Sequence, residues 1–342
     1  MKRIAVYGCY GLTGSLVVRE LVTRGYEPVL CGRDADALSL LSRNLGSRNY
    51  TATAHIDDPS SLDRMLDNVD AVLNCAGPYS NTSLPIATAA IRNRVHYLDP
   101  NAVEQLAAKR LFDELNTAAK QAGVSVVPVM GIFGGLGDAL ADVASKGKPN
   151  IEEVIIAYKV DGWIPTRGSQ LTSSLLQSTK RLAFESGAFR EVAASRAVEE
   201  FNFGPEAGKA LVLSDYPGSE IATVPRHLPT KRVAVKMTLS TIQDLASVDP
   251  AQASSVDSET RSKSTFSVVV DVRDPRGTTR VTAAGNDIYG ITAPFMVNAL
   301  ELLPSAKTGV CSPSEAFGGR RLVEAVRSHG FVHELTHVSG DS

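Results

Sequence analysis

Three glycines near the start of the chain, Gly8, Gly11 and Gly14, limit its fold more than any other feature. They lie between the apolar run Ile4–Tyr7, which predicts a strand, and Leu16–Arg24, whose pattern predicts an amphipathic helix. Glycines at such a junction allow a tight turn, close approach of a diphosphate to the backbone, and close packing of the helix on the strand. The free N–H groups at the start of the helix would then bind phosphate.

The spacing is GxxGxxG rather than GxGxxG, but its position between a strand and a helix is the context that a dinucleotide-binding turn requires. A purely structural glycine turn is the alternative. The residues expected to hold the dinucleotide here are Gly8, Tyr10, Gly11, Leu12, Thr13 and Gly14.

The second predicted strand is Glu27–Cys31. The residues that follow it indicate which of the two nicotinamide cofactors is bound. An acidic residue at this point would bind the ribose 2′-hydroxyl of NAD, whereas an arginine accommodates the 2′-phosphate of NADP. The sequence has Gly32-Arg33-Asp34, so Arg33 predicts NADP and Asp34 is expected to cap the next helix. A surface role for Arg33 is the alternative. Asp57 and Asp58 follow the third strand, where a carboxylate often contacts the adenine; Asp57 is the candidate contact, and helix capping before Pro59 is the alternative.

Strand-like and helix-like patterns alternate up to Gly131, which predicts an α/β fold with a doubly wound parallel sheet. Beyond Gly131 the chain predicts a helix capped by Asp138, a helix over Gln170–Phe184, and neighbouring strands that suggest a second α/β domain with a mixed or antiparallel sheet. Residues Ser247–Ser264 predict a solvated loop that is long enough for a mobile lid. Thr292–Leu303 and Pro313–Gly330 predict two closing helices.

Composition excludes several classes of partner. The 342 residues carry a formal net charge of -2 with no basic stripe, so neither nucleic acid nor an anionic membrane is expected as a partner. The four cysteines, Cys9, Cys31, Cys75 and Cys311, form no CxxC pair and predict reduced thiols. With no apolar run of about 20 residues and no recognisable signal peptide, we expect a cytoplasmic protein.

Four segments together carry a family resemblance: the glycine turn, Gly32-Arg33-Asp34, Asn74-Cys-Ala-Gly-Pro-Tyr79 and His96-Tyr-Leu-Asp99. The N-terminal 140 residues resemble the saccharopine dehydrogenase-like reductases, a group that includes the trans-acting enoyl reductases of lipid synthesis. The resemblance continues weakly in Tyr216–Glu220 and Asn286–Tyr289. Gly134-Gly-Leu-Gly-Asp138 departs from it, because the family usually has a proline before this aspartate.

The resemblance implies an NADP-binding Rossmann domain over residues 1–131, to which C-terminal helices at about 312–332 return. It implies a substrate and dimerisation domain over 132–311. A homodimer is the expected assembly, because dimers are the commonest oligomers of soluble proteins. It also implies that the segment after the fourth strand runs beside the nicotinamide ribose and that Asp99 lies near the cofactor. The residues of that segment are Asn74, Cys75, Ala76, Gly77 and Pro78.

A reductase needs a proton donor, and tyrosine or histidine could supply the proton. Tyr79, His96 and Tyr97 adjoin predicted strand ends, where the ligand crevice of a doubly wound sheet lies, and Tyr289 lies at a strand–helix junction. A structural role is the alternative for each. None of the nine tyrosines has a lysine four positions later, so the Tyr–Lys pair of short-chain dehydrogenases is missing.

The sequence therefore predicts an NADP(H)-dependent oxidoreductase that reduces a C=N or conjugated C=C bond of a small-molecule or carrier-tethered intermediate. A non-catalytic NADP-binding regulator and an NADP-dependent isomerase or epimerase are the alternatives. His333-Glu-Leu-Thr-His337 matches the HExxH zinc motif, but it lies close to the last residue, and we expect no metal site there. No GxSxG motif is present, which disfavours hydrolase chemistry.

Overall fold

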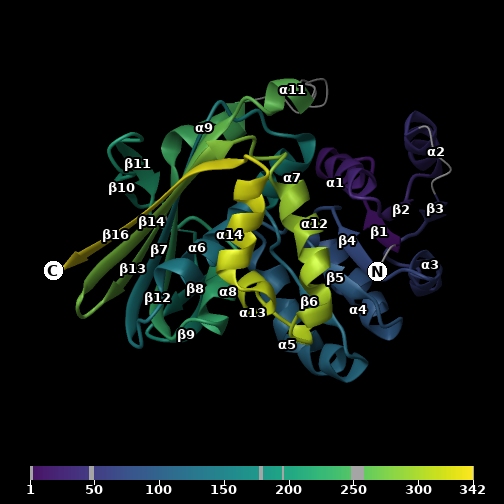
Figure 1. Cartoon of the computed structure of the whole chain (residues 1–342), viewed down its shortest axis with the longest axis horizontal. Coiled ribbons are helices and arrows are strands. Elements are labelled where there is room, and N and C mark those ends of the chain that lie inside the picture. The colour runs from purple at the N-terminus through teal and green to yellow at the C-terminus, as the bar shows by residue number, and fades with distance from the viewer. Residues whose placement is uncertain (1–2, 46–49, 177–179, 195, 248–257, 342) are drawn as a thin grey trace.

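The computed structural model describes residues 3–45, 50–176, 180–194, 196–247 and 258–341. Two sheets lie on opposite sides of the molecule, with helices packed between them (Figure 1). The N-terminal segments, in purple and blue, form one side, and the strands of the second sheet, in teal and green, form the other. No helix in the described part of the chain is both long and apolar enough to cross a bilayer.

Sheet A carries the dinucleotide-binding turn. In the described residues it has seven strands, all parallel, in the order β15-β6-β5-β4-β1-β2-β3. Their bounds are β1 (Arg3–Tyr7), β2 (Glu27–Gly32), β3 (Tyr50–Thr53), β4 (Ala71–Asn74), β5 (His96–Leu98), β6 (Ser125–Val127) and β15 (Gly309–Val310). The order reverses beside β1, which makes the carboxyl ends of β1 and β4 the expected ligand crevice.

Both faces of sheet A are covered by helices. Along β1, Ile4 and Val6 pack into one apolar cluster, while Ala5 and Tyr7 pack into the other, as the alternation of a strand requires. Helices α1 (Leu12–Thr23), α2 (Ala35–Asn44) and α12 (Thr292–Leu302) pack into the first cluster. Helices α3 (Pro59–Met65), α4 (Tyr79–Arg92) and α5 (Gln105–Ala122) pack into the second.

Sheet B is mixed, as the sequence suggested: β12 and β7 pair in parallel, and the other strand pairs among the described residues are antiparallel. Its main path is β10-β11-β12-β7-β13-β14-β16. The strands are β7 (Ile151–Asp161), β8 (Arg181–Glu185), β9 (Ala188–Val192), β10 (Val198–Asn202), β11 (Lys209–Leu213), β12 (Thr230–Thr238), β13 (Thr265–Asp274), β14 (Gly277–Asn286) and β16 (Val332–Asp341). The helices connecting these strands are α7 (Arg167–Leu176), α8 (Glu220–Thr223), η2 (Val224–Arg226), α9 (Leu239–Ser247) and α11 (Ser258–Arg261).

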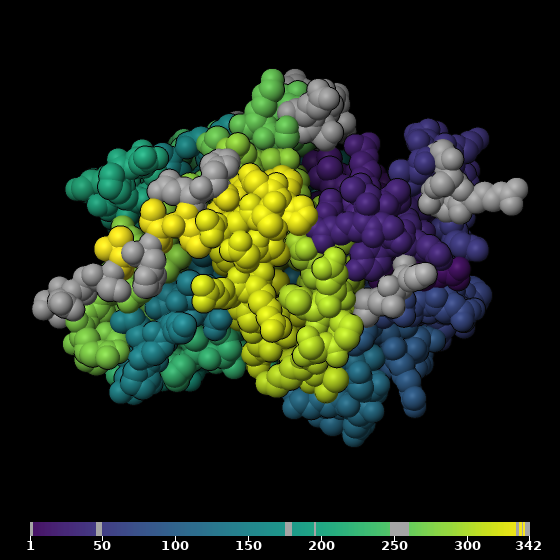
Figure 2. Space-filling model, in the orientation of Figure 1, coloured from purple at the N-terminus to yellow at the C-terminus, as the bar shows by residue number. Residues whose placement is uncertain are grey.

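A row of helices joins the two sheets. Helix α12, followed by η3 (Leu303–Ser305), packs on α1, and α13 (Pro313–Phe317) and α14 (Gly319–Ser328) pack on α6 (Gly137–Ala144). The helical turn η1 (Ile132–Leu136) precedes α6. The space-filling view shows the yellow C-terminal segments lying between the purple N-terminal part and the teal and green part (Figure 2). One apolar cluster runs through this row from sheet A to sheet B.

Several expectations for the second half of the chain were wrong. The predicted helix over Gln170–Phe184 ends at Leu176, and β8 follows, because Leu182 and Phe184 alternate inward on a strand that pairs with β9 and β12. The predicted loop over Ser247–Ser264 contains α11, and its residues 248–257 lie outside the described part. The predicted helix over Pro313–Gly330 is broken at Gly318, where φ is +80°.

The interpretation of Asp138 as a helix cap also needed correction. Asp138 does not cap α6; it lies in the first turn of that helix, where its carboxylate accepts a hydrogen bond from the Ser314 backbone N–H. The HExxH segment lies in β16, which pairs with β14. Since the zinc motif needs a helix to bring its histidines together, a strand does not form it.

Candidate functional site

The glycine turn has the geometry of a phosphate cradle. Gly8 has a φ of +81°, and its backbone N–H donates to the Cys31 carbonyl oxygen at 2.8 Å. A Cβ on Gly14 would lie 2.3 Å from the Gly8 carbonyl oxygen, so only glycine allows α1 to start this close to β1. Gly11 precedes α1 and no side chain caps the helix. The first backbone N–H groups of α1, from Leu12 onward, therefore have no acceptor within the helix.

Arg33 lies at the carboxyl end of β2, beside this turn. Its backbone N–H donates to the Tyr10 hydroxyl at 3.3 Å, and the Tyr10 ring packs over Gly32. The guanidinium is exposed. Asp34 caps α2 as predicted, because its carboxylate accepts from the backbone N–H groups of Asp36 and Ala37. Asp34, the acidic side chain that could bind the ribose of NAD, is thus hydrogen-bonded to the helix. The exposed side chain beside it that could bind a 2′-phosphate is the cation Arg33.

The two aspartates after β3 have separate roles. Asp58 caps α3 through the backbone N–H groups of Ser60 and Ser61, which confirms the capping interpretation for that residue. Asp57 lies in the preceding turn and is exposed. It stays a candidate contact for the adenosine half of a dinucleotide.

The segment after β4 lies beside the glycine turn. A Cβ on Gly8 would lie 2.8 Å from Cβ of Ala76, so the two backbones are in contact. Asn74 is buried beneath the segment, where its amide nitrogen donates to Thr82 and Tyr97 and its amide oxygen accepts from the backbone N–H of Ala76. Cys75 and Gly77 line the cavity described next, and Pro78 directly precedes α4.

A cavity of about 610 Å³ begins at the glycine turn and extends to sheet B. Tyr10, Gly11, Leu12 and Thr13 line one end. Sheet B and its connections supply the other end, including Trp163, Thr166, Ser169 and Tyr289. Among the described residues that line it, two side chains are formally charged, Arg167 and Arg261, and both are cations. This lining suits neutral and anionic groups.

Tyr289 is the predicted acid with the most developed surroundings. The indole Nε1–H of Trp163 donates to its hydroxyl oxygen at 2.9 Å, and the backbone N–H of Thr166 donates at 3.0 Å. The Ser169 hydroxyl lies 3.1 Å from the same oxygen. All four residues line the cavity. Three hydrogen-bonding groups therefore converge on one phenolic oxygen, and two of them can only donate.

Tyr79 also lines the cavity, but in a different environment. Burial, together with Cys75, Asp99 and Glu104, raises the pKa of the Tyr79 hydroxyl well above its ordinary value. A phenol in such surroundings resists ionisation. Tyr79 is therefore better suited to forming a wall of the cavity than to releasing a proton.

Tyr97 and Asp99 form a buried network below the cavity. The Tyr97 hydroxyl donates to the Asp99 carboxylate at 2.6 Å, and Ser83 donates to the same oxygen. The backbone N–H groups of Asn101 and Val129 donate to the other oxygen. Burial raises the pKa of Asp99 despite these donors. Neither side chain lines the cavity, so the expectation that Tyr97 faces the crevice is wrong; the two residues hold the loop after β5, whose residue Asn101 lines the cavity. That Asp99 lies near the cofactor stays a prediction.

His96 lies at the amino end of β5, paired with Ala71 at the start of β4. Its Nδ1 accepts a hydrogen bond from the backbone N–H of Ser125, and burial lowers the pKa of the imidazole. The crevice is at the carboxyl ends of the strands, so the prediction of His96 as a crevice residue was wrong. Strand β5 contains only three residues, so the sequence pattern did not distinguish its amino end, where His96 lies, from its carboxyl end.

A buried carboxyl group beneath the cavity was not predicted. Glu220 accepts hydrogen bonds from the Tyr158 hydroxyl and from the backbone N–H of Gly134, at 3.0 Å for the latter. Burial raises the pKa of Glu220 to about 7. Phe133, next to Gly134, packs on both Tyr158 and Trp163. The weak resemblance around Tyr216–Glu220 was the only signal in the sequence for this residue.

These features define a class: a Rossmann-type dinucleotide-binding fold whose crevice opens toward a second sheet. Residues 4–130 match the family model described as the saccharopine dehydrogenase NADP binding domain. The N-terminal part of the chain is therefore an NADP-binding domain of the saccharopine dehydrogenase type, and the chain is similar to proteins named saccharopine dehydrogenase-like oxidoreductases. The glycine cradle and the exposed Arg33 fit this cofactor.

Relatives and solved structures agree with this placement. A saccharopine dehydrogenase-like oxidoreductase from Bos taurus is 25% identical over 164 residues, which are 43% of this chain and 38% of that protein. The Homo sapiens protein of the same name is 29% identical over 113 residues, 28% of this chain and 26% of that protein. A lipid droplet localized protein from Caenorhabditis elegans is 27% identical over 139 residues, 37% of this chain and 32% of that protein.

The matched stretches thus span well under half the length of each of these relatives. The apo saccharopine dehydrogenase (L-Glu forming) from Saccharomyces cerevisiae superposes with a TM-score of 0.66 at 10% identity, covering 99% of this chain and 100% of that one. At this identity the superposition establishes a shared fold. Among the described residues, no group of three or more His, Cys, Asp or Glu side chains is arranged to hold a metal ion.

Proposed function

We propose that this protein is an NADPH-dependent reductase that adds a hydride and a proton across a C=N or conjugated C=C bond, with Tyr289 as the proton donor. One observation carries the proposal. The cavity that starts at the dinucleotide turn ends at a tyrosine whose oxygen is met by three hydrogen-bonding groups. A hydride donor and a proton donor could therefore both act on one substrate bound in this cavity.

The residues that would hold the cofactor are at one end of the cavity. The first backbone N–H groups of α1 would bind the diphosphate, and Arg33 would bind the 2′-phosphate. Cys75 and Gly77 would lie beside the nicotinamide end, because they line the cavity next to the turn. When bound, NADPH supplies the hydride.

Tyr289 would give its hydroxyl proton to the nitrogen or carbon atom that gains negative charge as the hydride arrives at the other end of the double bond. The charge left on the phenolic oxygen would be stabilised by the N–H groups of Trp163 and Thr166. These donors are in place before the reaction and need no reorganisation. They supply the electrostatic support that a lysine provides in enzymes with a Tyr–Lys pair.

The proposal is tested by following NADPH absorbance during incubation of the full chain with a panel of cyclic imines and enones, including carrier-bound thioesters. Loss of absorbance that depends on substrate supports a reductase. Tight NADPH binding with no turnover of any compound would instead favour the non-catalytic regulator. Conversion of substrate without net loss of NADPH would favour the isomerase or epimerase.

A further inference from the structure

The hydrogen bonds around Tyr289 fix where its proton points. A phenolic oxygen has one hydrogen to donate and at most two positions at which to accept. The acceptor positions are filled by Trp163 Nε1–H and by the Thr166 backbone N–H, neither of which can accept a hydrogen bond. The remaining neighbour is the Ser169 hydroxyl at 3.1 Å. In the resting protein, the Tyr289 hydroxyl therefore donates to Ser169.

Ser169 is itself held in place from the other side. Its backbone N–H donates to the Thr166 hydroxyl oxygen at 3.0 Å, the bond of a helix N-cap at the start of α7. Its own hydroxyl lies 3.0 Å from the same Thr166 oxygen. While Ser169 accepts from Tyr289, its hydrogen points to Thr166. The three hydroxyl groups of Tyr289, Ser169 and Thr166 thus form a chain with a defined direction.

We infer that Ser169 is a positioning residue that reverses its hydrogen bond when Tyr289 loses its proton. This inference rests on the proposed function. When substrate binds, the Tyr289 hydroxyl turns from Ser169 toward the atom to be protonated; its O–H bond breaks as the proton moves to that atom, and the electron pair stays on the phenolic oxygen. The Ser169 hydroxyl then rotates from Thr166 toward that oxygen and donates to it. Water returns a proton to Tyr289 later, and no oxidant or reductant beyond NADPH is needed.

The reversal gives the tyrosinate three donors where the neutral tyrosine has two. Trp163 and Thr166 donate in both states, whereas Ser169 accepts from the neutral tyrosine and donates to the tyrosinate, where a hydrogen bond to a charged oxygen is stronger. An interaction made only after proton release favours that release over the ground state. Thr166 contributes twice, because its N–H supports Tyr289 and its hydroxyl holds Ser169 ready.

The inference is tested by placing 3-fluorotyrosine at position 289 of the full chain and titrating it by ¹⁹F NMR without substrate or cofactor. Ser169→Ala should raise the pH of ionisation by about one to two pH units, the equivalent of one hydrogen bond to a charged oxygen. Ser174→Ala is the matched control: Ser174 is on the same helix, is exposed and bonds to the Gln170 carbonyl. It should leave the titration unchanged. Arg167 and Arg261, the charged groups of the cavity, are retained in every variant.

A second pair of variants separates the hydroxyl from the shape of the side chain. Ser169→Thr keeps the hydroxyl and should titrate close to the unsubstituted protein, whereas Ser169→Val has the same shape without it and should titrate as Ser169→Ala does. Thr166→Ser, which keeps both Thr166 contacts, should also be neutral. Equal ionisation in the Thr and Val variants at position 169 would overturn the inference.

Turnover gives an independent readout. In Ser169→Ala, kcat should fall by about tenfold or more, with KM changed much less, because the lost bond is made only after proton transfer. A protein that reduces no compound of the panel would refute the proposed function. The fluorine titration would still decide whether Ser169 supports the tyrosinate, so the two failures are distinguishable.

Discussion

The carboxylate of Glu104 receives the backbone N–H of Tyr79 at 2.8 Å, and its second oxygen receives that of Ser80 at 2.7 Å. Glu104 therefore caps α4 from another part of the chain, since Pro78 before the helix offers no side-chain cap. The carboxylate is buried and lies at the positive end of the helix dipole. It holds in place the backbone of Tyr79, the residue of α4 that lines the cavity.

Glu104→Ala should therefore destabilise the protein. Two charge-assisted hydrogen bonds are lost and two buried N–H groups lose their acceptor, so we expect a decrease of about 2–4 kcal/mol in the free energy of unfolding in urea. Glu114→Ala is the control, because Glu114 is an exposed residue of α5 whose carboxylate pairs with Arg110 at the surface. It should change stability by less than about 0.5 kcal/mol. Similar losses in both variants would contradict the capping role.

The choice of cofactor should depend on Arg33. Arg33→Ala removes the cation beside the 2′-phosphate, so NADPH binding should weaken by about 1.5–3 kcal/mol, while NADH binding should change little. Isothermal titration calorimetry with both nucleotides measures the difference. Arg43→Ala, which removes an exposed arginine at the far end of α2, should leave both affinities unchanged. An equal loss for NADPH and NADH in Arg33→Ala would contradict the assignment of the 2′-phosphate contact.

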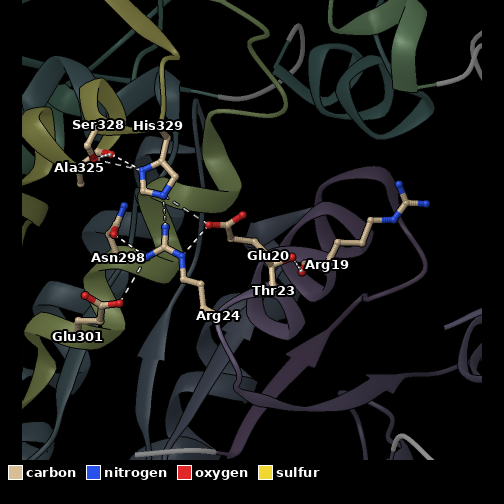
Figure 3. Close-up of polar contacts among 9 residues, drawn as sticks. All are labelled: Arg19, Glu20, Thr23, Arg24, Asn298, Glu301, Ala325, Ser328 and His329. Carbon is tan, nitrogen blue, oxygen red and sulfur yellow. Dashed lines mark hydrogen bonds and ion pairs between the residues drawn. The ribbon is translucent and has the colours of Figure 1, made fainter. Parts of the chain in front are cut away.

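Arg24 joins three helices at the end of α1 (Figure 3). Its guanidinium donates to Glu20 at 2.7 Å and to Asn298 of α12 at 2.6 Å, and it contacts His329 after α14 at 2.7 Å. Because these contacts use different nitrogens of one planar group, Arg24→Lys should not replace them. We expect both Arg24→Lys and Arg24→Ala to lower the melting temperature, the latter by several degrees.

Arg19 provides the control for this cluster. It lies on the same helix, but its side chain points away from the cluster into solvent (Figure 3). Arg19→Ala should therefore have the same melting temperature as the unsubstituted protein in differential scanning calorimetry. If the Arg24 and Arg19 variants melted alike, the cluster would contribute nothing measurable to the packing of α1 on the C-terminal helices.

A buried ion pair should make stability depend on pH. His227 contacts the Asp138 carboxylate at 3.0 Å, and Asp142 and Glu315 are the other acids acting on it. Burial lowers the pKa of His227, but Asp138 together with Asp142 and Glu315 outweighs burial, so the net shift is upward. Burial likewise raises the pKa of Asp138, but His227 together with the hydrogen bonds from Ser314 and Thr223 outweighs it, so the net shift is downward.

The directions of these two pKa shifts define the pH range in which the ion pair stabilises the fold. The raised pKa of His227 contributes stability below the unfolded value of about 6.5, and this contribution is lost as pH rises through the folded pKa. The lowered pKa of Asp138 contributes stability above about 4, lost as pH falls through the folded value. His227→Gln should therefore destabilise by about 3 kcal/mol near pH 6 and by less near pH 9. His55→Gln, at an exposed histidine, should show no such trend in urea unfolding.

The first hundred residues were readable from sequence because their signals are local. The strand β1, the glycine turn and α1 follow one another directly, and the capping by Asp34 involves residues two and three positions away. Boundaries were less accurate: the helix predicted over Leu16–Arg24 begins at Leu12. The positions of Cys75 and Gly77 on the cavity followed from the rule that ligands lie at the carboxyl ends of parallel strands.

The end of the cavity at sheet B could not be predicted from the sequence, because the residues in contact there are distant in sequence. Tyr289 could be named as a candidate, but Trp163, Thr166 and Ser169 lie 120 to 126 residues away, and only the pairing of sheet B brings them to it. Nothing local marks these residues. Similarly, β8 and β9 are short and partly exposed, and their place is set by the pairing of Phe184 with Val233.

The proton donor gives the most direct test of the proposed chemistry. Tyr289→Phe removes the hydroxyl and keeps the ring, so NADPH affinity should stay within about twofold, while kcat should fall by about 10²–10⁴-fold, the usual contribution of a general acid. The pH dependence of the residual rate should also change, because the acid would then be water. Single-turnover NADPH oxidation in a stopped-flow instrument measures the step. Tyr50→Phe, at an exposed tyrosine that begins β3 and whose ring contacts Arg3, should turn over normally. A Tyr289→Phe protein with an unchanged single-turnover rate would move the search for the acid to Tyr79, the other predicted tyrosine that lines the cavity.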